Sequence, residues 1–300
     1  MTAMEKRAGS ESTSPASGPE DAPEEVTEEV TGEVTGEVTV TTQRVLVALD
    51  RSPHSYAALR AAAQLAATLR AELHGLYVED AQLLRLCNSP FSREVSVLTA
   101  TVRPLRSVEI ERKLQVMAAE LRRQLAYAAA EAQVQWSFHV RRGGVEQELL
   151  AEAENALLLG LGRTNQFARR GVGSTARRLA RMGSRPLLLL GQREDFRGPL
   201  TLVYTGSAGA KRALTLTAQL AQQSTQPLTI LLVADAEQAE TMHSEVAEQL
   251  QSFTVPPNLV TIDAAEDQTS IIKNITGALV LPGDYVELLA EVEGPVLLVP

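Results

Sequence analysis

Residues 156–190 read ALLLGLGRTNQFARRGVGSTARRLARMGSRPLLLL, two apolar runs separated by a polar, arginine-rich segment. An apolar run ends at Gly160, and a polar loop follows it. Helical spacing then predicts a helix over residues 174–182, before a second apolar run at residues 186–190. Two buried strands joined through a helix run parallel, because the crossover returns the chain to the same end of the sheet. The stretch therefore predicts a βαβ unit in an open parallel sheet.

The same alternation of strands and helices reaches back to residue 44. Further strands are predicted at residues 44–49, 73–78 and 134–140, and further helices at residues 55–69, 109–132 and 145–154. Ser52 and Pro53 stand where the N-cap and first-turn residues of the first helix belong. Residues 81–106 show no clear period. The five strands, with 156–159 as the fourth, predict a parallel sheet with helices on both faces.

The second half of the chain repeats the first. At an offset of 155, residues 50–66 are identical to residues 205–221 at seven of seventeen positions. Later strands align at smaller offsets, and about 13 residues are missing from the second copy between its fourth and fifth strands. We interpret this pattern as a tandem duplication with a trimmed second unit. The deletion is expected to remove the loop and helix that follow the fourth strand.

Charge and composition differ along the chain. The formal net charge is −9, and residues 1–42 contribute ten acidic residues against Lys6 and Arg7. This segment is expected to be a disordered acidic tail, followed by domains at residues 43–192 and 199–300. The nearly neutral remainder excludes a nucleic-acid binder driven by overall basicity. One cysteine, Cys87, excludes an internal disulfide, and no apolar run approaches the ~18 residues of a membrane span. We expect a soluble, cytoplasmic protein.

Candidate ligand-binding residues lie at the ends of the first and fourth strands, where open parallel sheets bind ligands. These ends are Asp50 and Gly160. Gly173, Ser174 and Thr175 begin the next helix, whose backbone N–H groups favour an anion. Residues 160–186 also hold seven arginines without any Asp, Glu or Lys, namely residues 163, 169, 170, 177, 178, 181 and 185. They favour phosphate; a solvated basic helix face is the alternative for residues 177, 178 and 181.

Three segments, VALDRSPHSYAALRAAAQLA at 47–66, LYVED at 76–80 and residues 156–190, resemble the universal stress protein family. The resemblance covers residues 44–191. It implies two doubly wound five-stranded parallel-sheet domains of the adenine-nucleotide α-hydrolase type, with strand order 3-2-1-4-5. Family members that bind ATP carry Gly-x-x-Gly, nine residues, then Gly-Ser or Gly-Thr. Gly160 and Gly173-Ser174 match, Asp50 matches the acidic residue after the first strand, and Val78 matches a residue lining the adenine pocket.

Arg163 stands where the family pattern has its second glycine. An arginine adds a side chain where backbone would approach a phosphate. Either its guanidinium contacts the phosphates instead, or the loop shifts by one residue and uses Gly162. In the second half, Pro282 and Thr205 replace Gly160 and Asp50, so this half is not expected to bind nucleotide by the family's mode.

The residues commit the chain to no catalytic group and no metal site. His54, His74, His139 and His243 lack the spacing of zinc ligands, and His74 and His139 lie inside predicted strands, as packed or edge residues. Gly206-Ser-Ala-Gly-Ala-Lys211 is too short for a P-loop and is interpreted as a capped helix start.

Three functions stay open at this point. The first is a regulatory protein whose first domain binds ATP or another adenine nucleotide, with Mg²⁺ as an accompanying ion, and which signals to an unknown protein partner. The second is an interaction scaffold that needs no nucleotide. The third is an ATPase or transferase on the same fold.

Assembly is expected within the chain. The fifth strands, 186–190 and 295–299, are apolar on both faces yet lie at sheet edges, which native chains cover or pair. The resemblance implies that such strands pair. We predict that the two strands lie antiparallel to each other in an intramolecular pseudo-dimer, with other surfaces left for a homo-oligomer.

Overall fold

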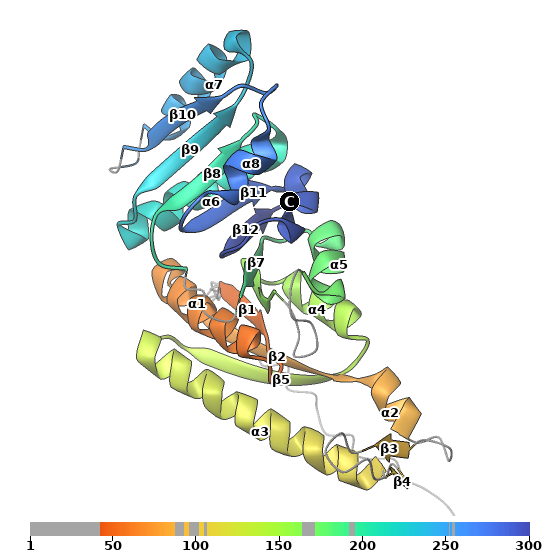
Figure 1. Cartoon of the computed structure of the whole chain (residues 1–300). Helices are drawn as coiled ribbons and strands as arrows, with labels where there is room; N and C mark the ends of the chain where they lie inside the picture. The colour runs from red at the N-terminus through yellow and green to blue at the C-terminus, as the bar shows by residue number, and fades with distance from the viewer. Residues whose placement is uncertain are drawn as a thin grey trace, which may run out of the picture. The chain divides into compact units, whose positions relative to one another are not determined.

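Ten of the described strands, five from each half of the chain, lie in one sheet (Figure 1). The computed structural model describes residues 43–87, 93–95, 102–104, 107–163, 172–191, 196–251, 253 and 256–300. The expected acidic tail, residues 1–42, lies outside the described residues. Residues 41–300 form one compact unit, and the boundary between the predicted domains falls inside its continuous sheet. The division into domains at 43–192 and 199–300 stays a prediction.

The first half follows the expected order of elements. Its strands in the large sheet are β1 (Arg44–Ala48), β2 (Glu72–Asp80), β5 (Trp136–Gly143), β6 (Leu158–Gly162) and β7 (Leu187–Leu190). Its helices are α1 (Pro53–Leu69), α2 (Ala81–Cys87), α3 (Ser107–Ala132), α4 (Val145–Ala153) and α5 (Ser174–Met182). The strands are parallel in the order β5-β2-β1-β6-β7, which is the expected 3-2-1-4-5. The fold prediction is confirmed.

The segment at residues 81–106, predicted to lack a clear period, contains regular structure. It holds α2 and a two-stranded antiparallel sheet of β3 (Arg93–Val95) and β4 (Val102–Pro104). Helix α2 follows β2 directly and has only seven residues, which is too short for its period to stand out in the sequence.

The second half has the same strand order. Its strands are β8 (Leu200–Tyr204), β9 (Leu228–Val233), β10 (Asn258–Ile262), β11 (Ala278–Pro282) and β12 (Val296–Val299). Its helices are α6 (Ala208–Ser224), α7 (Ala236–Gln249), α8 (Gln268–Lys273) and the 3₁₀ helix η1 (Gly283–Ala290). The order β10-β9-β8-β11-β12 is again 3-2-1-4-5. The helix expected to be deleted after the fourth strand is therefore present as η1, and only the loop before it is short.

Matching local signals set the ends of α1 and α6. The Ser52 hydroxyl accepts from the backbone N–H of Ser55 at 3.1 Å, and Ser207 caps α6 in the same way through Ala210 at 3.2 Å. Both helices end at a left-handed residue, Arg70 with φ 53° and Thr225 with φ 55°. These paired positions keep the offset of 155 seen in the sequence. Equivalent capping chemistry thus builds equivalent helices in the two halves.

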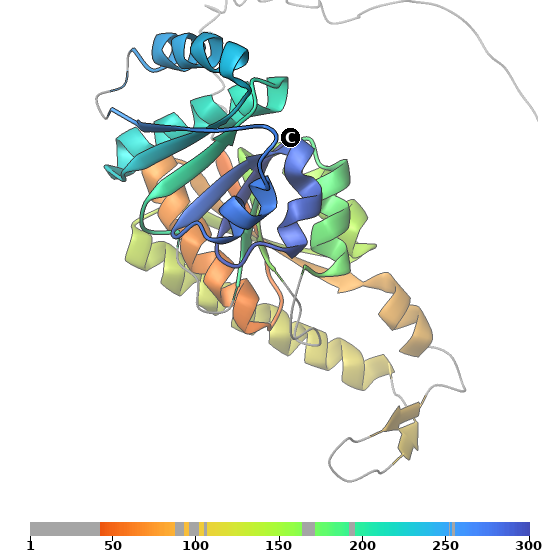
Figure 2. The same ribbon diagram turned by 45° about the horizontal axis from the view of Figure 1, so that its top comes forward.

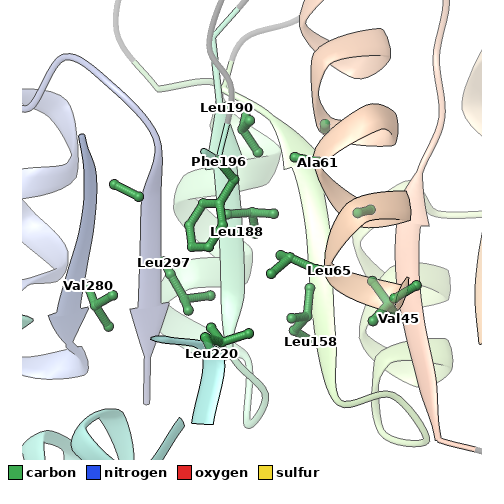
Figure 3. Packing of buried hydrophobic residues seen from close by; sticks show 14 of the residues in the cluster. Val45, Ala61, Leu65, Leu158, Leu188, Leu190, Phe196, Leu220, Val280 and Leu297 are labelled. Carbon is green, nitrogen blue, oxygen red and sulfur yellow. The ribbon is translucent and has the colours of Figure 1, made fainter. Parts of the chain in front are cut away.

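The two halves meet at their fifth strands. β7 and β12 pair antiparallel, with Leu188 opposite Leu297, and both side chains are fully buried. In Figure 3 these two leucines lie in one apolar cluster with Leu65 of α1 and Leu220 of α6. On the other face of the sheet, η1 lies beside α5 (Figure 2). The predicted antiparallel pairing is confirmed, and it covers both apolar edges.

Candidate functional site

A pocket of about 250 Å³ opens at the carboxyl ends of β1, β2 and β6. β1 lies beside β6, and the chain runs from β1 to β2 in one direction along the sheet and from β6 to β7 in the other. The pocket therefore occupies the topological switch point. Seven of the predicted site residues line it, namely Asp50, Val78, Gly162, Arg163, Gly173, Ser174 and Thr175. Apolar residues from β2 and α4, including Leu76 and Leu149, complete the wall.

Gly160 does not line the pocket. It lies inside β6, and a Cβ added there would stand 3.6 Å from the Cβ of Ala62 and from the carbonyl oxygen of Leu46, which is ordinary contact. Gly162 has the tighter position, because an added Cβ would come within 2.8 Å of the Cβ of His54 and 2.9 Å of the Ser55 nitrogen. The position on β6 that requires glycine is therefore residue 162, because α1 packs closely against it.

Asp50 is held at the rim by the start of α1. One carboxylate oxygen accepts from the backbone N–H of Ser52 at 2.8 Å. The Asp50 backbone N–H donates to the Ser55 hydroxyl at 3.0 Å, and that hydroxyl lies 3.4 Å from the carbonyl oxygen of Ala48. Ser55 lines the pocket and was missed in the sequence analysis. Its position in the sequence, three residues after the N-cap Ser52, could have identified it as a residue near the end of β1.

The end of β2 supplies a neutral wall. The Tyr77 side chain is buried, and its hydroxyl contacts the sulfur of Met117 at 3.1 Å. Burial, together with the nearby carboxylates of Glu79 and Asp50, raises the pKa of Tyr77 to about 12. The phenol is therefore uncharged at neutral pH. Val78 beside it is half-buried and apolar.

Helix α5 begins at the pocket. Its N-cap, Gly173, has φ −61° and ψ 158°, and no side chain among the described residues caps the helix. The Gly173 backbone N–H donates to the carbonyl of Arg163 at 2.8 Å, which closes the base of the loop between them. Ser174 and Thr175 start the first turn, where backbone N–H groups and the helix dipole favour an anion. Residues 164–171, with Arg169 and Arg170, lie outside the described residues.

The guanidinium of Arg163 contacts the second half of the chain. It donates to the carbonyl oxygens of Leu289 at 3.1 Å and Val292 at 3.0 Å, and it also contacts that of Gly294. Leu289 lies in the last turn of η1, where carbonyl groups lack helical partners and attract a cation. That Arg163 contacts phosphate stays a prediction, and in this structure its guanidinium contacts the second half instead. Its backbone lines the pocket while its side chain binds the second half.

The arginines of α5 form a solvated basic helix face, which was the alternative to a phosphate-binding role. Arg178 pairs with Glu146 at 2.9 Å and Arg181 with Glu287 at 2.8 Å, and both arginine side chains are more than half exposed. Arg177 donates to the carbonyl of Val172 at 3.2 Å. These three cations thus lie on the outer surface of α5, so among the described residues of this helix the groups that suit an anion are the backbone N–H groups of its first turn.

The matching strand ends of the second half carry different residues. Pro282 ends β11, and Gly283 follows at once as the first residue of η1. A Cβ on Gly283 would stand 3.2 Å from the Cα of Pro300. The Thr205 hydroxyl, at the Asp50 position, bonds to Ser207 at 3.2 Å. The backbone of Pro300 thus lies close to the start of η1.

Two of the four histidines, for which no metal site was expected, lie next to each other in the structure. His74 on β2 and His139 on β5 lie in T-shaped contact with ring centroids 4.6 Å apart. Glu152 of α4 faces both. The spacing in the sequence could not show this, because the three residues come from three elements. The alternation of the two strands was the available signal, since His74 and His139 point to the same face.

Sheet order, crossover helices and the pocket at the switch point define a doubly wound α/β protein. The Universal stress protein family model matches residues 41–190, half of the chain, and the chain belongs to this family. A search of curated proteins found no match. None of the described helices is long and apolar enough to cross a membrane.

Solved structures share the fold over both halves. A universal stress protein from Archaeoglobus fulgidus DSM 4304 is 13% identical and has a TM-score of 0.64, over 85% of this chain and 97% of that chain. A functionally unknown protein from Pseudomonas aeruginosa PAO1 is 14% identical with a TM-score of 0.54, over 86% of this chain and 92% of that chain. At these identities the likeness concerns the fold alone.

Proposed function

We propose that the first half binds an adenine nucleotide such as ATP as a regulatory ligand, and that the second half is its structural partner. The observation that carries the proposal is the pocket at the switch point, where Asp50 and the uncapped start of α5 face a common space. Asp50 offers an acceptor for a ribose hydroxyl, and the backbone N–H groups of Ser174 and Thr175 suit a phosphate. Val78 and Leu76 suit the apolar face of a base.

The size of the pocket limits the ligand. Ligand pockets typically begin at about 300 Å³, and this one measures about 250 Å³. A nucleoside-sized body fits better than an extended substrate. Arg163 joins the loop base to η1, so a ligand that moves this loop also acts on the second half. This coupling is the route by which occupancy would change a surface for a partner protein.

A scaffold that needs no nucleotide is the second candidate. The observation in its favour is also Arg163, which replaces the family's second glycine. Its guanidinium donates to carbonyl groups of the second half. In that case the pocket binds no ligand, and the function depends on the fixed pairing of the two halves.

The test is calorimetric titration of ATP into the purified full chain, with native mass spectrometry for nucleotide that co-purifies. Gly173→Val is the decisive variant: the φ of −61° accepts a β-branched residue, so the loss comes from the filled pocket. The matched control is Gly144→Val, which replaces the glycine N-cap of α4, with φ −76° and outside the pocket lining. Binding that is lost in Gly173→Val and kept in Gly144→Val supports the proposal. Absence of binding to the wild-type chain would favour the scaffold.

A further inference from the structure

His74, His139 and Glu152 form a cluster apart from the pocket. Parallel pairing places His74 opposite Ser137 and Leu76 opposite His139, so both histidines lie on the face that α4 covers. Nε2 of His74 lies 3.2 Å from Oε1 of Glu152, and Nδ1 of His139 lies 3.9 Å from the same oxygen. One ligand atom from each residue lies within 4.8 Å of the others.

The hydrogen bonds behind His74 decide which ring nitrogen carries its proton. The Ser137 hydroxyl donates to the carboxylate of Glu72 through a short hydrogen bond. A hydroxyl has one proton, so Ser137 can only accept from His74, whose Nδ1 lies 2.7 Å away. Nδ1 of His74 is therefore the donor. In the neutral ring, Nε2 is left with its lone pair.

That lone pair points toward another acceptor. His74 is 2% exposed, and its buried Nε2 has no hydrogen-bond partner among the described residues, although Oε1 of Glu152 lies only 3.2 Å away. A cation bound between these two atoms would give each of them a partner.

Neighbouring charges leave one carboxylate oxygen for such a cation. Arg141 donates to Oε2 of Glu152 at 3.4 Å, so Oε1 faces the two rings. Arg44 pairs with Glu72 at 3.0 Å and holds that carboxylate behind Ser137. The chain Glu72–Ser137–His74 is the kind of outer support that fixes the orientation of a metal-binding histidine.

We propose that His74, His139 and Glu152 bind a divalent transition-metal ion, with Zn²⁺ as the best match. Two imidazoles and one carboxylate are a common zinc ligand set. With bonds of about 2.0–2.1 Å, tetrahedral ligand atoms lie roughly 3.4 Å apart, close to the 3.2 Å between His74 and Glu152. The side chain of His139 is 47% exposed, so it is free to close the longer distance and leaves the fourth position to water.

This site is separate from the candidate nucleotide pocket. His74 precedes Val78 by four residues on β2, a separation of about 13 Å along the strand. α4 spans both places, since Val145 and Leu149 line the pocket and Glu152 belongs to the cluster. The proposal therefore does not depend on nucleotide binding.

The experiment is calorimetric titration of ZnCl₂ into the full chain after treatment with a chelator, in the absence of nucleotide. The variants are His139→Ala and Glu152→Gln, because both side chains reach solvent and their loss leaves the core intact. His243→Ala is the matched control, a histidine of α7 that bonds the Thr261 hydroxyl at 3.0 Å far along the chain. We expect one tight site per chain, with affinity reduced at least about tenfold in both variants and unchanged in the control.

Two further measurements keep the outcome clear. Co²⁺ in place of Zn²⁺ should give the visible absorption bands of a four-coordinate ion, and these should disappear in His139→Ala. Ser137→Ala removes the outer support and should weaken zinc binding by about tenfold. Wild-type protein without a tight zinc site, or equal affinity in His139→Ala, Glu152→Gln and the control, would overturn the proposal. If the wild type, the two variants and the control bound zinc with equal affinity, the ion would lie elsewhere, for example on the acidic residues 1–42.

Discussion

The guanidinium of Arg163, at the end of β6, donates to the carbonyl oxygen of Leu289 in η1 at 3.1 Å, across 126 positions of the sequence. The backbone of Arg163 meanwhile joins the start of α5 and the end of β7, through Gly173 and Leu190. One residue thus connects the rim of the pocket to the second half. It occupies the position where the family pattern has glycine, so the departure from that pattern serves the union of the halves.

Arg163→Lys should lower the stability of the folded chain. A lysine keeps the charge but cannot span the carbonyls of Leu289, Val292 and Gly294, because it lacks the planar fork of donors. We expect a loss of about 2 kcal/mol, measured by urea unfolding. Arg181→Lys, at an exposed pair with Glu287, is the control and should change stability by less than about 0.5 kcal/mol. Equal effects of the two changes would contradict the assigned role.

Arg163→Gly restores the family pattern and tests the pocket directly. Because the guanidinium faces the second half, its removal should not weaken ATP binding. Calorimetry should give an affinity equal to or higher than that of the wild type, despite a lower melting temperature. Weaker binding by a folded variant would show that the arginine turns toward the phosphates when ligand is present.

Gly162→Ala should destabilise the protein while Gly160→Ala should not. The added Cβ at 162 would meet the Cβ of His54 at 2.8 Å, whereas at 160 its nearest neighbours are 3.6 Å away. We expect a loss of about 1–3 kcal/mol for Gly162→Ala. Thermal unfolding of the two variants, two positions apart on one strand, measures the difference. If both behave alike, the close approach of α1 to Gly162 is wrong.

Leu188→Asp should disrupt the union of the halves. Leu188 and Leu297 are fully buried opposite each other, so the carboxylate would have no solvent and no partner. Stability should fall by more than about 3 kcal/mol, and size-exclusion chromatography should detect expansion or self-association. Leu188→Val keeps the site apolar and should cost about 1 kcal/mol. A soluble, compact and stable Leu188→Asp variant would rule out the pairing of β7 with β12.

Stability should fall in alkaline solution because of buried tyrosines. The pKa of Tyr77 and that of Tyr204 are each raised to about 12, chiefly by burial. Unfolded tyrosine loses its proton near pH 10, so between about pH 10 and 12 the folded chain holds more protons than the unfolded chain. The free energy of unfolding then decreases as pH rises, by at most about 1.4 kcal/mol per pH unit for each tyrosine. Urea unfolding at several pH values measures this slope, and Tyr77→Phe should reduce it. A slope unchanged in Tyr77→Phe would contradict the shift.

The sequence alone determined most of the elements and many of the residues that line the pocket. Helix α1 was predictable because its signals are local: Ser52 caps it, Pro53 opens it and an alanine-rich face follows. Asp50 and the residues 173–175 were predictable because strand and helix ends meet at one edge of a parallel sheet. Strand order and the pairing of β7 with β12 were expected from the family resemblance together with the apolar edges.

The tertiary structure alone decided the partners of individual side chains. Arg163 could not be assigned from its neighbours in the chain, since the carbonyls that hold it belong to η1 in the other half. His74, His139 and Glu152 share no spacing, because the register of β2 with β5 and the packing of α4 bring them together. Gly162 rather than Gly160 proved to be the tight position for the same reason, as α1 comes closer to Gly162 than to Gly160. Local signals act through the backbone within a few residues, whereas these contacts depend on the placement of elements far apart in the sequence.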